Sequence, residues 1–161
     1  PLFTDFTYDN IGVPRNPDNP FYTQSEFNPE GSAWVDLGLG EFLSSRTEYQ
    51  QFASANRGKQ KVPTLRNVDK RPYRGFPKAY AHNGYFKSLK GIVHFYNTRD
   101  AKPTCRNPFT READALAQNC WPAPEVPENV NTREMGNLHL TNAQENAIVA
   151  FLKTLSDGYQ P

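Results

Sequence analysis

The chain has 161 residues, which is enough for one domain with its own hydrophobic core. A formal net charge of +1 gives no electrostatic reason to expect nucleic acid or an anionic membrane as a partner. No apolar run is long enough to span a bilayer, and no signal peptide is evident.

The composition predicts a small core built around large rings. Mean hydropathy is low, at −0.77, yet aromatic residues make up 13% of the chain. Each aromatic side chain buries more area than an aliphatic one, so a few rings or a large apolar cofactor could organise the domain. The 14 prolines and 10 glycines predict long ordered loops.

The two cysteines, Cys105 and Cys120, flank a proline-rich loop. Their spacing excludes a CxxC redox motif and a CxxCH haem-attachment motif within this chain. One prediction is a disulfide, which would close a loop of about 15 residues, add roughly 3 kcal/mol and imply an oxidising compartment. The alternative is two unrelated buried thiols.

The first half of the chain reads mostly as loop. Residues 1–33 show no sustained periodicity, and residues 34–40 are rich in turn signals. A short helix is predicted over residues 47–55, with Ser44 or Ser45 as its cap. An extended approach follows at residues 61–67, because Val62 precedes a proline.

Stronger signals come in the second half. Asn83-Gly84 predicts a turn, and residues 86–97 then predict a helix with an apolar face. Ser88 is an alternative start for that helix. That face comprises Leu89, Ile92, Val93 and Tyr96.

A long insertion at residues 98–140 follows, with a short helix predicted over residues 110–119 and capped by Thr110. The last helix opens at Thr141, which forms a capping box with Gln144, and Asp157-Gly158 supplies its stop. Its predicted buried stripe comprises Ala147, Ile148, Phe151, Leu152 and Leu155.

The three histidines do not predict a zinc site. They lack the spacing of a helical pair and have no acidic or cysteine partner at ligand spacing. His94 lies two positions before Tyr96, so it should point away from the Tyr96 face and be partly exposed. His139 is expected to be structural. His82, next to the Asn83-Gly84 turn, is either a site residue or a hydrogen-bonded histidine that fixes the turn.

The order of several short motifs resembles the C-terminal domain of the bacterial di-haem cytochrome c peroxidase family, which includes MauG-type enzymes. The similarity covers nearly the whole chain, and it depends on the joint presence of the motifs rather than on any one of them. The matching segments are Phe3-Thr-Asp-Phe6, Asn10-Ile-Gly-Val-Pro14, Asp36-Leu-Gly-Leu-Gly40, Gly58-Lys-Gln-Lys-Val-Pro-Thr-Leu-Arg-Asn-Val68, Tyr80-Ala-His-Asn-Gly84, Ser88-Leu-Lys-Gly-Ile-Val-His-Phe-Tyr-Asn97, Gly136-Asn-Leu-His-Leu-Thr141 and Ile148-Val-Ala-Phe-Leu152.

The resemblance implies a mainly α, cytochrome c-like fold with long ordered loops, as a single domain over residues 1–161. It also implies haem c. The family's CxxCH is missing from this chain and is expected upstream of Pro1, in a processed or truncated product that could have lost an export signal. No catalytic residue is expected in this chain.

On the distal side, the alignment puts Tyr96 at the position of the axial iron ligand, where peroxidases of the family have Met and MauG-like members have Tyr. Tyr96 could instead be a core aromatic. Met135 is the alternative ligand, or a gap-filling hydrophobe. The other cofactor-binding residues implied by the resemblance are His82, Tyr80, Leu65, Arg66 and Lys61, the last two either near the propionates or as a solvated surface pair.

The resemblance therefore predicts the redox domain of a di-haem peroxidase or MauG-like oxidase, exported to the periplasm or a similar compartment. Its expected partners are the N-terminal haem domain of the same protein, where hydrogen peroxide reacts, and a small c-type cytochrome or another protein redox partner. Calcium between the domains is possible, although residues 71–78 lengthen the loop that contributes to that site in shorter relatives. The alternative from another class is a haem-free structural or interaction subunit of a larger redox assembly.

Overall fold

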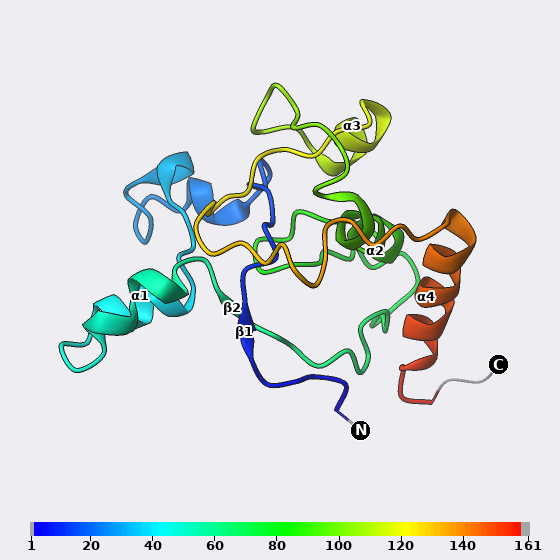
Figure 1. The fold of residues 1–161 in the computed structure, drawn as a ribbon, viewed down its shortest axis with the longest axis horizontal. Helices are drawn as coiled ribbons and strands as arrows, with labels where there is room; N and C mark the ends of the chain where they lie inside the picture. The colour runs from blue at the N-terminus through cyan, green and yellow to red at the C-terminus, as the bar shows by residue number, and fades with distance from the viewer. Residues whose placement is uncertain (1, 159–161) are drawn as a thin grey trace.

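Helices are the main regular elements of the chain, and long loops connect them (Figure 1). A computed structural model describes residues 2–158, so residue 1 and residues 159–161 of the predicted domain lie outside the described part. Within the described part the helices are α1 (Leu39–Ser44), α2 (Leu89–Thr98), α3 (Glu112–Ala117) and α4 (Asn142–Thr154). Four 3-10 turns lie at Pro20–Thr23, Gly31–Ala33, Gln50–Phe52 and Ser54–Asn56.

The only sheet in residues 2–158 is a short antiparallel pair of β1 (Tyr8–Asp9) and β2 (Gln60–Lys61). Tyr8 pairs with Lys61, so the N-terminal segment runs beside the segment that follows β2. Figure 1 shows this pair between the α1 lobe on one side and α4 on the other. No helix within the described range is long and apolar enough to cross a membrane.

Helix α2 begins at Leu89, later than the predicted residue 86. Its N-cap is Ser88, which is the alternative predicted start. The Ser88 side chain accepts a hydrogen bond from the Gly91 amide. Phe86 instead pairs with Tyr80 across a tight turn. The predicted apolar face is only partly right, since Leu89 and Val93 are buried whereas Tyr96 is exposed.

Helix α4 has the predicted capping box, in which the Gln144 amide donates to the Thr141 hydroxyl and the Gln144 side chain accepts from the Thr141 amide. The predicted buried stripe is largely wrong. Leu152 is buried, but Ile148 and Phe151 are 37% and 52% exposed. The helix packs on α2 along a different line, through Glu145, Val149 and Leu152, which follow one another at helical spacing.

The helix predicted over residues 47–55 is not present. Helix α1 lies earlier, and Ser45 ends it as its C-cap. Gly40 decides this position, because a Cβ at residue 40 would lie 2.6 Å from the Arg57 Cα. Only a glycine lets the two backbones come this close, and this contact sets the position of α1. The residues predicted as helical form 3-10 turns instead.

Helix α3 is shorter than the predicted range of residues 110–119, and its N-cap is Arg111 rather than Thr110. The Thr110 hydroxyl bonds to the Asn107 carbonyl, and the Thr110 carbonyl accepts from the Tyr85 hydroxyl. The disulfide between Cys105 and Cys120 is confirmed, and it closes the loop that carries α3.

The core is an aromatic cluster next to this loop. Phe86 lies 5.0 Å from Tyr85 and 4.9 Å from Phe95, and Phe95 lies 5.2 Å from Trp121, measured between ring centres. The edge-to-face pairs among them, Tyr85 with Phe86 and Phe95 with Trp121, add to the stabilisation from buried area. Trp121 follows Cys120 directly, so the disulfide-closed loop supplies one of the core rings.

Replacing both cysteines by serine should lower the free energy of unfolding by about 3 kcal/mol, because the unfolded chain would regain the freedom of a loop of about 15 residues. Urea denaturation of the double variant and of the wild type measures the difference. Reduction of the wild type should give the same loss. An unchanged free energy in both experiments would contradict the assigned role of the disulfide.

Candidate functional site

Helix α2 presents two different faces. One face carries Tyr96, and the other carries Lys90, His94 and Asn97, which are spaced at helical intervals and all contact α4 through one carboxylate, that of Glu145. The first face is open and apolar. The second is a buried polar network.

Tyr96 lies near the end of α2 and is 37% exposed. Burial, followed by the nearby Asp9 carboxylate, raises the pKa of its phenol. Its backbone carbonyl accepts a hydrogen bond of 2.7 Å from the Gly136 amide. Met135, the other candidate ligand, therefore precedes the residue that holds Tyr96 in place, and its own side chain is only 6% exposed.

Large apolar side chains are exposed on the N-terminal segment, on α4 and on the segments of Leu65 and Leu138. Phe3 contacts Phe151 edge to face at 6.3 Å between ring centres, and the Leu65 amide donates to the Phe3 carbonyl. The Leu138 amide bonds to the carbonyl of Asn97, next to Tyr96. The exposed apolar residues of these segments are Leu2, Phe3, Phe6, Tyr8, Leu65, Leu138, Ile148 and Phe151.

The two basic residues predicted near propionates, Lys61 and Arg66, lie on the segment that runs beside the N-terminal segment. The Lys61 ammonium is 5.6 Å from the centre of the Phe6 ring. The Arg66 guanidinium forms an exposed ion pair of 2.5 Å with Asp157. A solvent-exposed pair of this kind contributes little stability. Arg66 could therefore leave Asp157 and pair with another anion at a small cost in free energy.

His82 and Tyr80 take part in two other polar contacts, each with its own carboxylate. His82 Nε2 lies 3.1 Å from the Glu125 carboxylate, which also accepts from the Asn83 side chain. The Tyr80 hydroxyl donates to Asp69, and burial followed by the Asp69 charge raises the pKa of Tyr80 to about 12. Both side chains thus have protein partners, and these partners are loop carboxylates rather than residues of the Tyr96 face.

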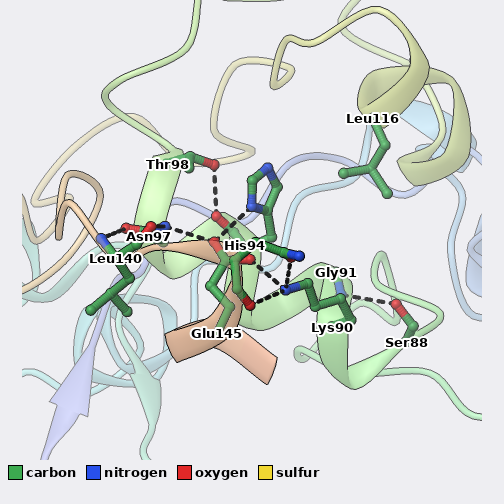
Figure 2. Close-up of a pocket in the computed structure, with 10 residues that line it drawn as sticks. Ser88, Lys90, Gly91, His94, Asn97, Thr98, Leu116, Leu140 and Glu145 are labelled. Atoms are coloured by element: carbon green, nitrogen blue, oxygen red, sulfur yellow. Dashed lines mark hydrogen bonds and ion pairs between the residues drawn. The ribbon is translucent and has the colours of Figure 1, made fainter. Parts of the chain in front are cut away.

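Figure 2 shows the network on the other face of α2, beside a cavity of about 350 Å³. Glu145 is 2% exposed. Its carboxylate lies 2.7 Å from Lys90 Nζ, 2.8 Å from His94 Nδ1 and 2.6 Å from Asn97 Nδ2. Sequence reasoning missed Glu145, because its partners lie about fifty residues earlier in the chain.

His94 connects this network to the aromatic core. As predicted, it points away from the Tyr96 side of the helix, and its side chain is partly exposed. Lys102 Nζ lies 2.6 Å from His94 Nε2 and 5.5 Å from the centre of the Trp121 ring. Since Lys102 donates to Nε2, the proton of a neutral His94 is on Nδ1 and points to Glu145. Within residues 2–158, no cluster of three or more His, Cys, Asp or Glu residues could hold a metal ion.

Comparison with known proteins supports the resemblance found in the sequence. No model of a protein family matches the chain. The methylamine utilization protein MauG of Paracoccus denitrificans is 35% identical over 161 residues, which are 99% of this chain and 36% of MauG. This chain is a relative of MauG and the di-haem cytochrome c peroxidases.

Peroxidases of the family match as well. A cytochrome-c peroxidase of Pseudomonas sp. is 24% identical over 97% of this chain and 34% of its own length. The crystal structure of the di-haem peroxidase BthA from Burkholderia thailandensis covers 98% of this chain and 35% of BthA, with 28% identity and a TM-score of 0.60. A BthA variant in which a tyrosine is replaced by methionine has a TM-score of 0.63. The chain spans about a third of the length of these relatives.

Stability at acid pH should depend on Glu145. Burial acts to raise its pKa, but hydrogen bonds from Lys90, Asn97 and His94 and the His94 charge lower it from 4.5 to about 2. Because the folded pKa lies below the unfolded one, Glu145 stabilises the fold above about pH 4.5, and this contribution is lost as the pH falls towards 2.

The test is urea denaturation of the wild type and of Glu145→Gln between pH 2 and pH 6. The difference in unfolding free energy between them should shrink steadily below about pH 4.5. Asp18→Asn is the control, because Asp18 pairs with Arg111 at an exposed position and should show little difference. A difference for Glu145→Gln that does not change with pH would contradict the assignment.

Proposed function

We propose that this chain is a haem-bearing, cytochrome c-like redox domain, the C-terminal part of a di-haem protein of the peroxidase and MauG type. The observation that carries the proposal is the open apolar face around Tyr96. Exposed Phe, Leu and Ile side chains lie on the N-terminal segment, on α4 and on the segments of Leu65 and Leu138, and a folded domain rarely leaves so many large apolar side chains open to water without a partner. Among the related proteins, BthA is a di-haem peroxidase.

The residues of this face fit a haem. Phe3, Phe151 and Ile148 offer apolar surface to a porphyrin, and the Tyr96 oxygen is the donor that an iron could take. A haem bound here would supply an iron that changes its oxidation state by one electron. The apolar side chains would exclude water from the bound group. The positive charges of Lys61 and Arg66 could neutralise the propionates of the haem.

Tyr96 fits the ligand position better than Met135 does. Its side chain reaches the open face, whereas the Met135 side chain is 6% exposed and packed inside the protein. A phenolate carries a negative charge, so it would favour ferric over ferrous iron, whereas a methionine thioether does the reverse. This preference suits MauG-like chemistry.

The attachment cysteines must come from outside this chain. Cys105 and Cys120 are bonded to each other, so neither is available for a thioether bond to haem. The CxxCH expected before Pro1 would supply both the covalent bonds and the proximal histidine. The disulfide itself suits an exported protein, because such bonds persist in oxidising compartments.

In this proposal the domain transfers electrons or oxidising equivalents between the peroxide-reacting haem of an N-terminal domain and a protein partner, such as a small c-type cytochrome. No residue of this chain acts on hydrogen peroxide. A calcium ion between the domains remains a prediction. The competing function is a haem-free interaction subunit, in which another protein rather than haem covers the Tyr96 face.

The intact gene product that contains this chain distinguishes the two functions. It should give a pyridine haemochrome spectrum of covalent haem c after denaturation, with two haems per polypeptide. A preparation that lacks covalent haem when it is made in cells that mature other c-type cytochromes would contradict the proposal.

Replacement of the ligand candidates gives a separate prediction. In the haem-loaded gene product, Tyr96→Phe should change the visible and electron paramagnetic resonance spectra of one ferric haem and raise its reduction potential, because a phenolate stabilises ferric iron. Met135→Leu is the matched variant and should leave both unchanged. A spectral change in Met135→Leu alone would assign the iron to Met135.

A further inference from the structure

We propose that Asn97 and Glu145 are positioning residues that hold the Tyr96 phenol in the orientation required of an iron ligand. The inference deepens the proposed function, and it rests on the ligand role proposed there for Tyr96. It concerns two residues of the polar network between α2 and α4.

The first step concerns the end of α2. The last four carbonyls of a helix have no partner within the helix. Near the end of α2, the Tyr96 carbonyl accepts from the Gly136 amide at 2.7 Å, and the Asn97 carbonyl accepts from the Leu138 amide at 3.1 Å. The segment of residues 136–140 therefore caps the turn of α2 that carries Tyr96.

The second step concerns the Asn97 side chain, which fixes that segment. Its amide nitrogen donates to the Leu140 carbonyl at 2.9 Å, and its amide oxygen accepts from the Leu140 backbone amide at 2.9 Å. A side chain that both donates and accepts in one plane is needed, so Asn fits where Asp or Leu would not. Asn97 is buried, which makes any lost partner costly.

The third step concerns rotation of α2 about its own axis. Asn97 also donates to the Glu145 carboxylate, which holds Lys90 and His94 of the same helix face. Three anchors on one side of a helix prevent it from turning against α4. Because Tyr96 is the neighbour of Asn97, a turn of the helix would move its phenol sideways across the open face.

A ligand has to be held within about 0.5 Å of its working geometry, and such precision comes from supporting residues with locked side chains. Glu145 and Asn97 meet this description, since both are buried and every polar side-chain atom of both has a hydrogen-bond partner. Their effect would reach the iron only through the position of Tyr96. A purely structural role would change stability and leave the ligand unchanged.

The test compares variants of the haem-loaded intact gene product by resonance Raman and electron paramagnetic resonance of the ferric haems. Asn97→Ala removes the three side-chain hydrogen bonds and should produce a second ferric species that lacks tyrosinate ligation. Glu145→Ala should do the same. Glu145→Gln keeps the size and an acceptor oxygen, so it should restore most of the wild-type spectrum.

Asn28→Ala is the matched control. Asn28 is an equally buried asparagine in the lobe of residues 20–33, where its side chain donates to the Phe21 and Gly31 carbonyls. This variant should lose stability to urea and keep the wild-type spectrum. Hydrogen exchange at the Gly136 amide supplies a second measurement, and it should accelerate in Asn97→Ala but not in Asn28→Ala.

Tyr96→Phe, measured in parallel, separates the possible failures. If Tyr96→Phe leaves the spectrum unchanged, both the ligand assignment and this inference are wrong. If Tyr96→Phe changes the spectrum while the Asn97 and Glu145 variants match the wild type, only the inference is wrong. Should Asn97→Ala fail to fold, Glu145→Ala and Glu145→Gln decide the question by the same comparison.

Discussion

The buried carboxylate of Glu145 is the interaction on which the arrangement of the helices depends. A charge this far from water is tolerated only when it is fully paired, and here the partners are Lys90, His94 and Asn97, all from α2. Removing one partner of such a group typically costs about 3–5 kcal/mol. The first turn of α4 is therefore bound to one defined face of α2. This contact determines which side of each helix stays outside the helix–helix interface.

The open apolar face is a consequence of that contact. With Glu145, Val149 and Leu152 turned towards α2, the side chains of Ile148 and Phe151 are directed elsewhere on α4. The N-terminal segment reaches the same side, where Phe3 contacts Phe151. A buried polar network between the two helices thus leaves apolar side chains of α4 and of the N-terminal segment exposed elsewhere.

Local signals in the sequence predicted local structure well. The capping box of Thr141, the alternative cap at Ser88 and the disulfide all depend on residues that are close in the chain or chemically distinctive. The buried stripe of α4 failed, because periodicity shows that a helix has an apolar side but not which of its apolar residues the protein core covers.

Long-range polar pairing was the part of the site that the sequence could not predict. Nothing near Glu145 in the chain marks it as a partner for His94, and nothing near Glu125 marks it as a partner for His82. Helix α1 was missed for a related reason: its place is set by the close approach of Gly40 to Arg57, a contact between backbones that no propensity encodes.

The two candidate iron ligands are not independent of each other. Met135 precedes Gly136, whose amide holds the Tyr96 carbonyl and whose own carbonyl accepts from the Asp100 amide. For the Met135 sulfur to reach the open face, this segment would have to turn, and it would lose these hydrogen bonds together with those to Asn97. Each is worth about 1 kcal/mol, and the buried Met135 side chain would lose its packing as well. The backbone bonds that support Tyr96 therefore also keep the Met135 side chain away from the open face.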